Sequence, residues 1–271
     1  MPTGDAFNEA EHLNALLDLF RSGVDTGGVS VRLVETSRKS GLSLHNVDRY
    51  ESDDNFARVV ERAKCIETKA KAEIDSGYSS IYSLAVVRLW TILENAVSRL
   101  AKLRLGDNSV LGSSPVLRRL NGPIVDILLS TPEERIDMIY EELASHLKVR
   151  LKPGVGRFEA LLESVGLSGG VDDEIRKELV ELWAVRNVIV HSSGRFDQRF
   201  LYACPWYPAA RNEIVTVSSS RFNVYLSAVL WYMKISADYP AACRGAEGGR
   251  GGRGGNWQVH PFLKGPFLDV V

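Results

Sequence analysis

Apolar residues recur at intervals of three and four along most of this chain, with polar residues between them. This spacing places the apolar side chains on one face of an α-helix, whereas a half-buried strand would alternate. Helices are therefore expected over residues 7–21, 55–76, 78–104, 157–166 and 221–237, with a shorter helical turn within 116–129. The pattern predicts a chain made mostly of helices.

The strongest local signal for the start of a helix lies at Thr131. A threonine caps the first turn well, and Pro132 suits the first helical position because its missing N–H would have no partner there. Glu133 and Glu134 follow, and acidic side chains are favourable near the positive end of the helix dipole. We expect this helix to run to Leu147.

Three segments fit the helical pattern less well. Residues 23–28 contain turn-forming glycines and predict a loop. Residues 29–35 alternate, so they fit either a strand or the start of a helix that continues to Ser40. Residues 200–204 and 214–217 have the composition of two short strands or extended arms. They predict a hairpin-like excursion before the last helix.

A helix expected from about Asp172 to His191 carries the chemistry of this chain. Its apolar face consists of four residues at helical spacing, and a second apolar row flanks that face. The four are Leu179, Leu182, Val185 and Ile189, and the flanking pair is Trp183 and Val190. Three polar residues interrupt this apolar helix: Arg186, Asn187 and His191.

The helix is predicted to stop at Ser192-Ser193-Gly194, because Gly194 can adopt the left-handed conformation that ends many helices. His191 would then lie in the last turn, where the helix dipole favours a protonated imidazole by roughly 0.3–1 kcal/mol. Asn187 and His191 are four residues apart and share a face.

The three polar residues suit the cleavage of RNA without a metal. The planar guanidinium of Arg186 matches a phosphate, and His191 can exchange a proton near neutral pH. Asn187 can orient the imidazole or donate to a phosphate oxygen. We expect His191 to act as base on the 2′-hydroxyl or as acid on the leaving 5′-oxygen. A surface Arg-Asn pair and a histidine that only complements the dipole remain the structural alternatives.

The spacing of Arg186 and His191 also bears on assembly. Five residues at about 100° each place the two side chains roughly 140° apart around one helix. A single helix therefore cannot easily direct both side chains at one atom. Two helices related by a two-fold axis could each supply part of a shared cleft. On this argument the sequence predicts a homodimer.

Composition limits the other possibilities. The net charge of −1 excludes a chain that binds nucleic acid through its overall charge, so RNA would need a local patch. The three cysteines, Cys65, Cys204 and Cys243, lack the spacing of a zinc site, and no metal or other cofactor is expected. A cytoplasmic protein is expected, because the chain has neither a basic, apolar leader at its start nor a membrane-spanning apolar stretch.

Arg186-Asn-Val-Ile-Val-His191, followed by Ser192-Ser-Gly194, resembles the Arg-x4–6-His signature of the HEPN superfamily, which has a polar residue directly after the arginine. The stretch from Ile81 to Val97 is similar to an early HEPN helix that often points an acidic or polar residue at the active site. Glu94 is the candidate for that residue, with Arg186 as its expected partner and a surface pair with Arg88 or Arg99 as the alternative. The resemblance covers roughly residues 55–240.

The resemblance implies an all-α fold, a HEPN-like helical bundle that dimerises and has a short hairpin-like excursion before its last helix. It further implies a metal-independent endoribonuclease, a toxin or phage-defence effector with a possible antitoxin or regulatory protein partner. A HEPN-fold module that binds RNA or protein without cleaving is the alternative function. Arg186, Asn187 and His191 would be catalytic, and Glu94 and Ser192 would support them.

Four segments are expected along the chain. Residues 1–54 form an N-terminal helical and loop extension, 55–243 the HEPN-like domain, 244–256 a disordered Gly/Arg-rich linker and 257–271 an apolar tail. Four arginines are candidates for RNA binding, two after the motif and two in the linker: Arg195, Arg199, Arg250 and Arg253. A solvated surface explains the basic residues of 58–71, although an RNA-tracking ridge is the alternative.

Overall fold

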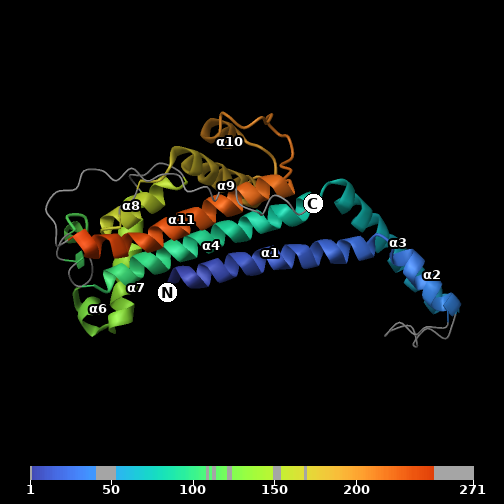
Figure 1. Ribbon diagram of the computed structural model, residues 1–271, viewed down its shortest axis with the longest axis horizontal. Coiled ribbons are helices and arrows are strands. Elements are labelled where there is room, and N and C mark those ends of the chain that lie inside the picture. The colour runs from blue at the N-terminus through green and yellow to red at the C-terminus, as the bar shows by residue number, and fades with distance from the viewer. Residues whose placement is uncertain are drawn as a thin grey trace. The chain divides into compact units, whose positions relative to one another are not determined.

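The computed structural model describes residues 2–40, 53–107, 110–111, 114–120, 124–148, 154–167 and 170–246. Within these ranges the chain is all-α, as expected (Figure 1). The elements are α1 (Pro2–Gly27), α2 (Ser30–Ser40), α3 (Asp53–Asp75), α4 (Ser79–Leu105), the 3₁₀ turn η1 (Leu117–Arg119), α6 (Ile124–Leu129), α7 (Pro132–Lys148), α8 (Gly156–Ser164), α9 (Asp173–His191), α10 (Gln198–Ala203) and α11 (Ser219–Ala246).

The chain divides into two compact units. One, here the first unit, comprises Met1–Phe7, Thr91–Ala184 and Val224–Val271. The other, the second unit, comprises Asn8–Trp90 and Val185–Asn223. The helices α4, α9 and α11 each contribute residues to both units. The candidate motif, Arg186 to His191, belongs to the second.

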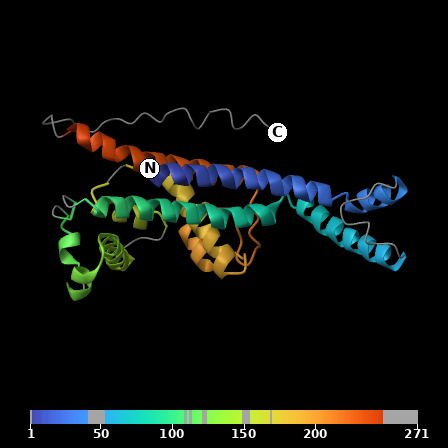
Figure 2. The same ribbon diagram turned by 90° about the horizontal axis from the view of Figure 1, so that it is seen from below.

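In the second unit, α1 runs beside the first half of α4, as two views of the ribbon show (Figures 1 and 2). Arg88 of α4 forms an ion pair with Glu9 of α1 at 2.9 Å. The hydroxyl of Tyr78, just before α4, donates to Asp25 Oδ1 at 2.5 Å. These two contacts lie at opposite ends of the paired segments, so they fix α1 antiparallel to α4.

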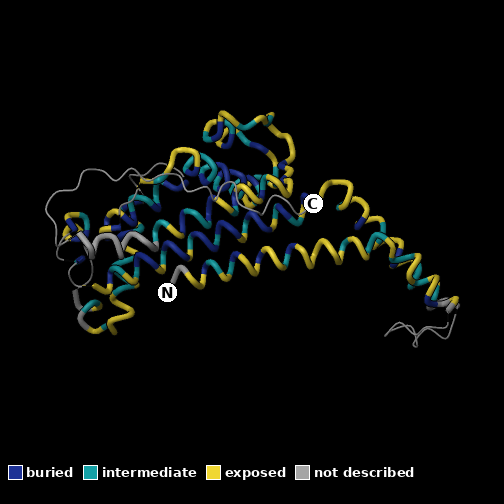
Figure 3. Tube along the Cα trace, in the orientation of Figure 1, coloured by how far each residue is buried: buried dark blue, intermediate teal, exposed yellow. Residues whose placement is uncertain are grey.

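In the first unit, α9 and α11 meet through a buried polar contact. The hydroxyl of Tyr225 on α11 donates to Glu181 Oε1 on α9 at 2.6 Å, and both residues are almost fully buried. Leu143 of α7, Leu162 of α8 and Leu179 of α9 are among the core residues of this unit. Figure 3 shows such buried positions along α4, α9 and α11.

Two expectations for the N-terminal region are decided by tertiary contacts. The loop expected at residues 23–28 is wrong, because α1 continues through it to Gly27. Residues 30–40 take the helical alternative. There the first turn of α2 finds partners on α3: the backbone N–H of Val31 donates to Glu67 Oε2 at 3.2 Å, and Ser30 Oγ donates to the carbonyl of Ala63 at 2.8 Å. An N-terminal helical N–H has no partner within its own helix, so this contact stabilises the helix over the strand.

The predicted start of α7 is confirmed. The backbone N–H of Glu134 donates to the Thr131 hydroxyl at 3.3 Å, while the backbone N–H of Thr131 donates to Glu134 Oε2 at 2.8 Å. This reciprocal pair is a capping box, which satisfies two N–H groups that the helix leaves without partners. The helical turn expected within 116–129 appears as η1 and α6.

The strand expected at residues 200–204 is wrong. Residues 198–203 form α10, because Asp197 caps this helix by accepting from the backbone N–H of Phe200. Residues 214–217 are extended, and among the described residues a single isolated bridge, between Arg195 and Ile214, is the only β pairing. The excursion before α11, residues 192–218, is therefore a loop that contains the short helix α10 and is closed by one isolated bridge.

Candidate functional site

The apolar face predicted for α9 is buried. Leu179, Leu182 and Val185 are buried, together with Val188, whereas Ile189 is only half-buried. The helix therefore packs firmly up to Val188 and leaves its last turn closer to solvent. His191 lies in that turn and is exposed, while Arg186 and Asn187 are half-buried.

The predicted end of α9 is confirmed. The backbone N–H of Gly194 donates to the carbonyl of Val188 at 3.0 Å, the long bond of a Schellman motif. Gly194 has φ +70°, and Ser193 also lies in the left-handed region with φ +52°. This backbone conformation is unfavourable for a residue with a side chain, so the residues around the end of α9 must stabilise Ser193 in it.

Arg186 brings the three predicted catalytic residues together within one chain. Its Nη1 donates to Asn187 Oδ1 at 3.0 Å and lies 3.5 Å from His191 Nε2. The angular separation of Arg186 and His191 on the helix is overcome by the length of the arginine side chain. The geometric argument for a dimer assumed that one helix cannot easily bring these two side chains together. That assumption is wrong, because no second copy is needed to join the guanidinium and the imidazole.

This contact constrains both side chains. An arginine N–H can only donate, so a bond to His191 Nε2 requires that nitrogen to carry its lone pair and the proton to sit on Nδ1. The Nε of Arg186 is buried and has no hydrogen-bond partner among the described protein atoms. Burying this donor without a partner is unfavourable; an anion at the outer guanidinium nitrogens would balance the positive charge of the group but would not bond Nε itself.

Ser192 has a positioning role in the structure. Its Oγ donates to Asp197 Oδ2 at 2.9 Å, while Asp197 Oδ1 accepts from the backbone N–H of Phe200 at 2.8 Å. The bond from Phe200, with a further one from Ser192, holds the pKa of Asp197 below its ordinary value. Asp197 thus joins the end of α9 to the start of α10. Sequence reasoning missed this residue, although an aspartate before a helical stretch is itself a capping signal.

The two arginines after the motif differ in their contacts. Arg195 Nη1 donates to the backbone carbonyl of Asn212 at 2.9 Å, so it helps to close the excursion. Arg199 is exposed on α10 and close enough to Asp197 to interact with it electrostatically. The other two candidates, Arg250 and Arg253, lie outside the described residues.

Glu94 belongs to the first unit, where its ion pair is with Arg157 of α8 at 3.4 Å. This partner differs from Arg186 and from the alternatives Arg88 and Arg99. Glu94 and Arg157 line a cavity of about 180 Å³ in that unit. The remaining lining residues come from α4, α7 and α8: Val97, Tyr140, Glu141, Ala144, Leu147, Phe158 and Leu161.

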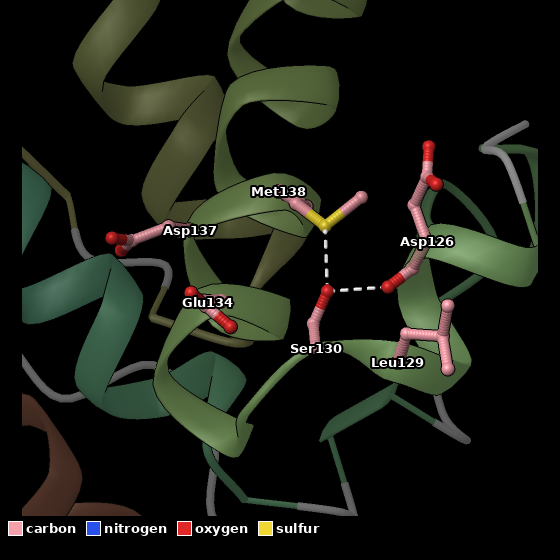
Figure 4. A pocket seen from close by; sticks show the side chains of 6 residues that line it. All are labelled: Asp126, Leu129, Ser130, Glu134, Asp137 and Met138. Atoms are coloured by element: carbon pink, nitrogen blue, oxygen red, sulfur yellow. Dashed lines mark hydrogen bonds between the residues drawn. The ribbon is translucent and has the colours of Figure 1, made fainter.

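A second cavity, of about 500 Å³, lies between α6 and α7 in the first unit (Figure 4). It is lined by Asp126, Leu129, Ser130, Glu134, Asp137 and Met138. Its three carboxylates repel the phosphates of a nucleic acid, and the Ser130 hydroxyl that Figure 4 shows at its centre is already directed at the Asp126 carbonyl and Met138. This cavity is therefore a poor site for RNA.

None of the described helices is both long and apolar enough to cross a lipid bilayer. No group of three or more His, Cys, Asp or Glu side chains in the described ranges is arranged to hold a metal ion.

The chain matches no protein-family model, no curated protein and no solved structure, so the likeness to the HEPN superfamily rests on the residues of α4 and α9 alone.

Proposed function

We propose that this protein is a metal-independent endoribonuclease of the HEPN type, with its reacting groups at the end of α9. The observation that carries the proposal is the approach of Arg186 Nη1 to His191 Nε2 at 3.5 Å. This approach supports the proposal, because a cation able to bind a phosphate and a ring able to exchange a proton then lie close enough to act on one phosphodiester. Asn187, through its Oδ1, holds the guanidinium in place.

The reaction needs these groups, the RNA itself and a water molecule that exchanges one proton. The 2′-oxygen attacks the neighbouring phosphorus as its proton passes to a base, and the bond from phosphorus to the 5′-oxygen breaks as that oxygen takes up a proton. The products are a 2′,3′-cyclic phosphate and a 5′-hydroxyl. His191 serves one of the two proton transfers and water serves the other. Arg186 stabilises the charge that develops on the phosphoryl oxygens.

A binding module without catalysis is the second candidate. The observation that favours it is that His191 Nε2 already faces the Arg186 guanidinium, so this ring nitrogen is shielded from a substrate proton. In such a module Arg186 would still hold a phosphate, and His191 would hold Arg186. Cleavage requires the imidazole to turn away from the guanidinium or to use Nδ1.

The decisive experiment incubates purified protein with RNA in EDTA and identifies the ends of the products. Wild type is expected to leave 2′,3′-cyclic ends, and His191→Ala and Arg186→Ala are expected to cut far more slowly. His12→Ala and Arg119→Ala, at exposed positions elsewhere, serve as matched controls that should cut normally. Equal cleavage by all five proteins would remove the catalytic assignment. RNA binding without cleavage by wild type would establish the second candidate.

The biological role and the partners belong to the same proposal. A ribonuclease of this kind acts in the cytoplasm as a toxin or phage-defence effector, and an antitoxin or regulatory protein restrains it. We also propose a homodimer, in which two α9 ends lie side by side and hold successive phosphates. The dimer now stands on the resemblance to HEPN proteins, since a single chain already joins Arg186 and His191.

A further inference from the structure

The excursion between α9 and α11 is unusually aromatic. Five of the twelve residues from 196 to 207 are Phe, Tyr or Trp: Phe196, Phe200, Tyr202, Trp206 and Tyr207. Three of them form a small core of their own. The ring of Phe196 lies 4.5 Å from that of Phe200, and the ring of Tyr207 lies 5.4 Å and 5.3 Å from the same two. These three account for the packing of the excursion.

The other two aromatic rings face solvent. Tyr202, on α10, is 88% exposed and Trp206 is 41% exposed. Two features anchor α10: the side chain of Asp197 caps its start, and Phe200 within it is buried. Tyr202 is therefore an exposed ring on an anchored element, and the fold gains little from its presence.

The excursion between α9 and α11 carries three arginines against two carboxylates, a small excess of positive charge. Arg199 precedes Tyr202 by three residues on α10, so the two side chains are neighbours on one face. Both carboxylates of the excursion are engaged with the backbone. Asp197 accepts from the N–H of Phe200, and Glu213 Oε2 accepts from the N–H of Ala210 at 2.8 Å. The three arginines of the excursion are exposed residues: Arg195, whose Nη1 donates to the Asn212 carbonyl, Arg199 and Arg211.

We propose that α10 is a stacking platform for single-stranded RNA, with a base on the Tyr202 ring and a neighbouring phosphate on Arg199. An exposed aromatic ring beside an arginine is the combination that binds unpaired nucleotides, because every base has a face to stack and every nucleotide carries a phosphate. A base within a duplex has no free face, so the platform selects unpaired RNA.

The platform adds a binding subsite to the proposed function. That RNA is its ligand rests on the proposed function. The chain from His191 to Tyr202 is eleven residues long and lies within one unit. A strand that stacks on Tyr202 is thus held by the same unit that carries Arg186 and His191. The proposed ribonuclease would on this basis prefer RNA in loops or unpaired segments over duplex RNA.

The test measures binding of fluorescein-labelled 2′-O-methyl oligonucleotides, which cannot be cut through a 2′-hydroxyl. One oligonucleotide carries bases, and a second has the same number of phosphates but abasic positions. Wild type is expected to bind the first more tightly. Tyr202→Ala is expected to weaken that binding roughly 5- to 150-fold, the loss of one stacked base, and to leave abasic binding unchanged. Tyr202→Trp should retain the preference.

Two further variants sharpen the result. Arg199→Ala should weaken both oligonucleotides and reduce the salt dependence by about one phosphate contact. Leu129→Ala, at a residue 82% exposed on α6, is the matched control and should change neither. Equal binding of the two oligonucleotides by wild type, or an unchanged affinity in Tyr202→Ala, overturns the platform and leaves Tyr202 as a surface for a protein partner. Cleavage in EDTA by Tyr202→Ala protein, measured separately, shows whether the proposed function survives that outcome.

Discussion

Nη1 of Arg186 lies 3.5 Å from Nε2 of His191, and the same nitrogen donates to Asn187 Oδ1 at 3.0 Å. One guanidinium therefore joins two polar side chains from the last two turns of α9. Both contacts use Nη1, and a guanidinium has a second terminal nitrogen that can serve a phosphate, whereas the ammonium group of lysine has a single nitrogen for all three partners.

Arg186→Lys is accordingly expected to behave almost like Arg186→Ala. The cleavage rate in EDTA should fall roughly 10²- to 10³-fold, the usual cost of removing one donor that stabilises a developing oxyanion. Single-turnover kinetics on a short RNA would measure it. Arg88→Lys is the matched control, because Arg88 is exposed and forms an ion pair with Glu9 that a lysine can keep. Full activity in Arg186→Lys would show that only the charge matters.

The hydroxyl of Tyr225 is expected to stabilise the fold. It donates to Glu181 in the core of the first unit, and removal of one partner of a buried hydrogen bond costs about 1–3 kcal/mol. Tyr225→Phe should therefore lower the free energy of unfolding by that amount in urea titrations. Tyr202→Phe makes the same chemical change at an exposed ring and should alter stability by less than about 0.5 kcal/mol. Equal effects in the two variants would contradict the structure.

Asp197 is expected to contribute stability that depends on pH. Its folded pKa is lowered, chiefly by the backbone N–H of Phe200, so its stabilising contribution is complete above the unfolded pKa of about 3.9. The contribution is lost as the pH falls through the lower folded pKa. Asp197→Ala should cost about 1 kcal/mol at pH 7, the usual value of a helix cap.

Denaturation of wild type and Asp197→Ala between pH 2 and pH 7 would measure this prediction. The difference between the two proteins should shrink below about pH 4. Asp197→Ser supplies a neutral cap and is the control, since a cap made by its hydroxyl does not titrate in this range. A difference between wild type and Asp197→Ala that stays constant down to pH 2 would argue against a carboxylate cap.

The proposed toxin role predicts an effect in living cells. Expression of wild type should inhibit growth, and His191→Ala should relieve that inhibition because the proton transfer is lost. His12→Ala should remain as toxic as wild type, since that histidine lies on the exposed side of α1. Growth curves after induction, with protein levels matched by immunoblot, would measure the effect. Undiminished toxicity of His191→Ala would rule out the ribonuclease as its cause.

Local signals in the sequence predicted the elements that depend on near neighbours. The Thr131 cap, the span of α4 and the stop of α9 at Gly194 follow from residues a few positions apart. The choice between strand and helix at residues 30–40 could not be made in this way. It depends on Glu67, more than thirty residues later, which accepts from the first turn of α2.

The site shows the same division. Sequence alone determined which residues share the end of α9, because helical periodicity places Arg186, Asn187 and His191 there. Only the tertiary structure decided that one guanidinium contacts both other side chains and that Glu94 pairs with Arg157. The reason is physical: periodicity fixes where a Cα lies on a helix, whereas the rotamers of long side chains and their distant partners are selected by packing and charge in the folded chain.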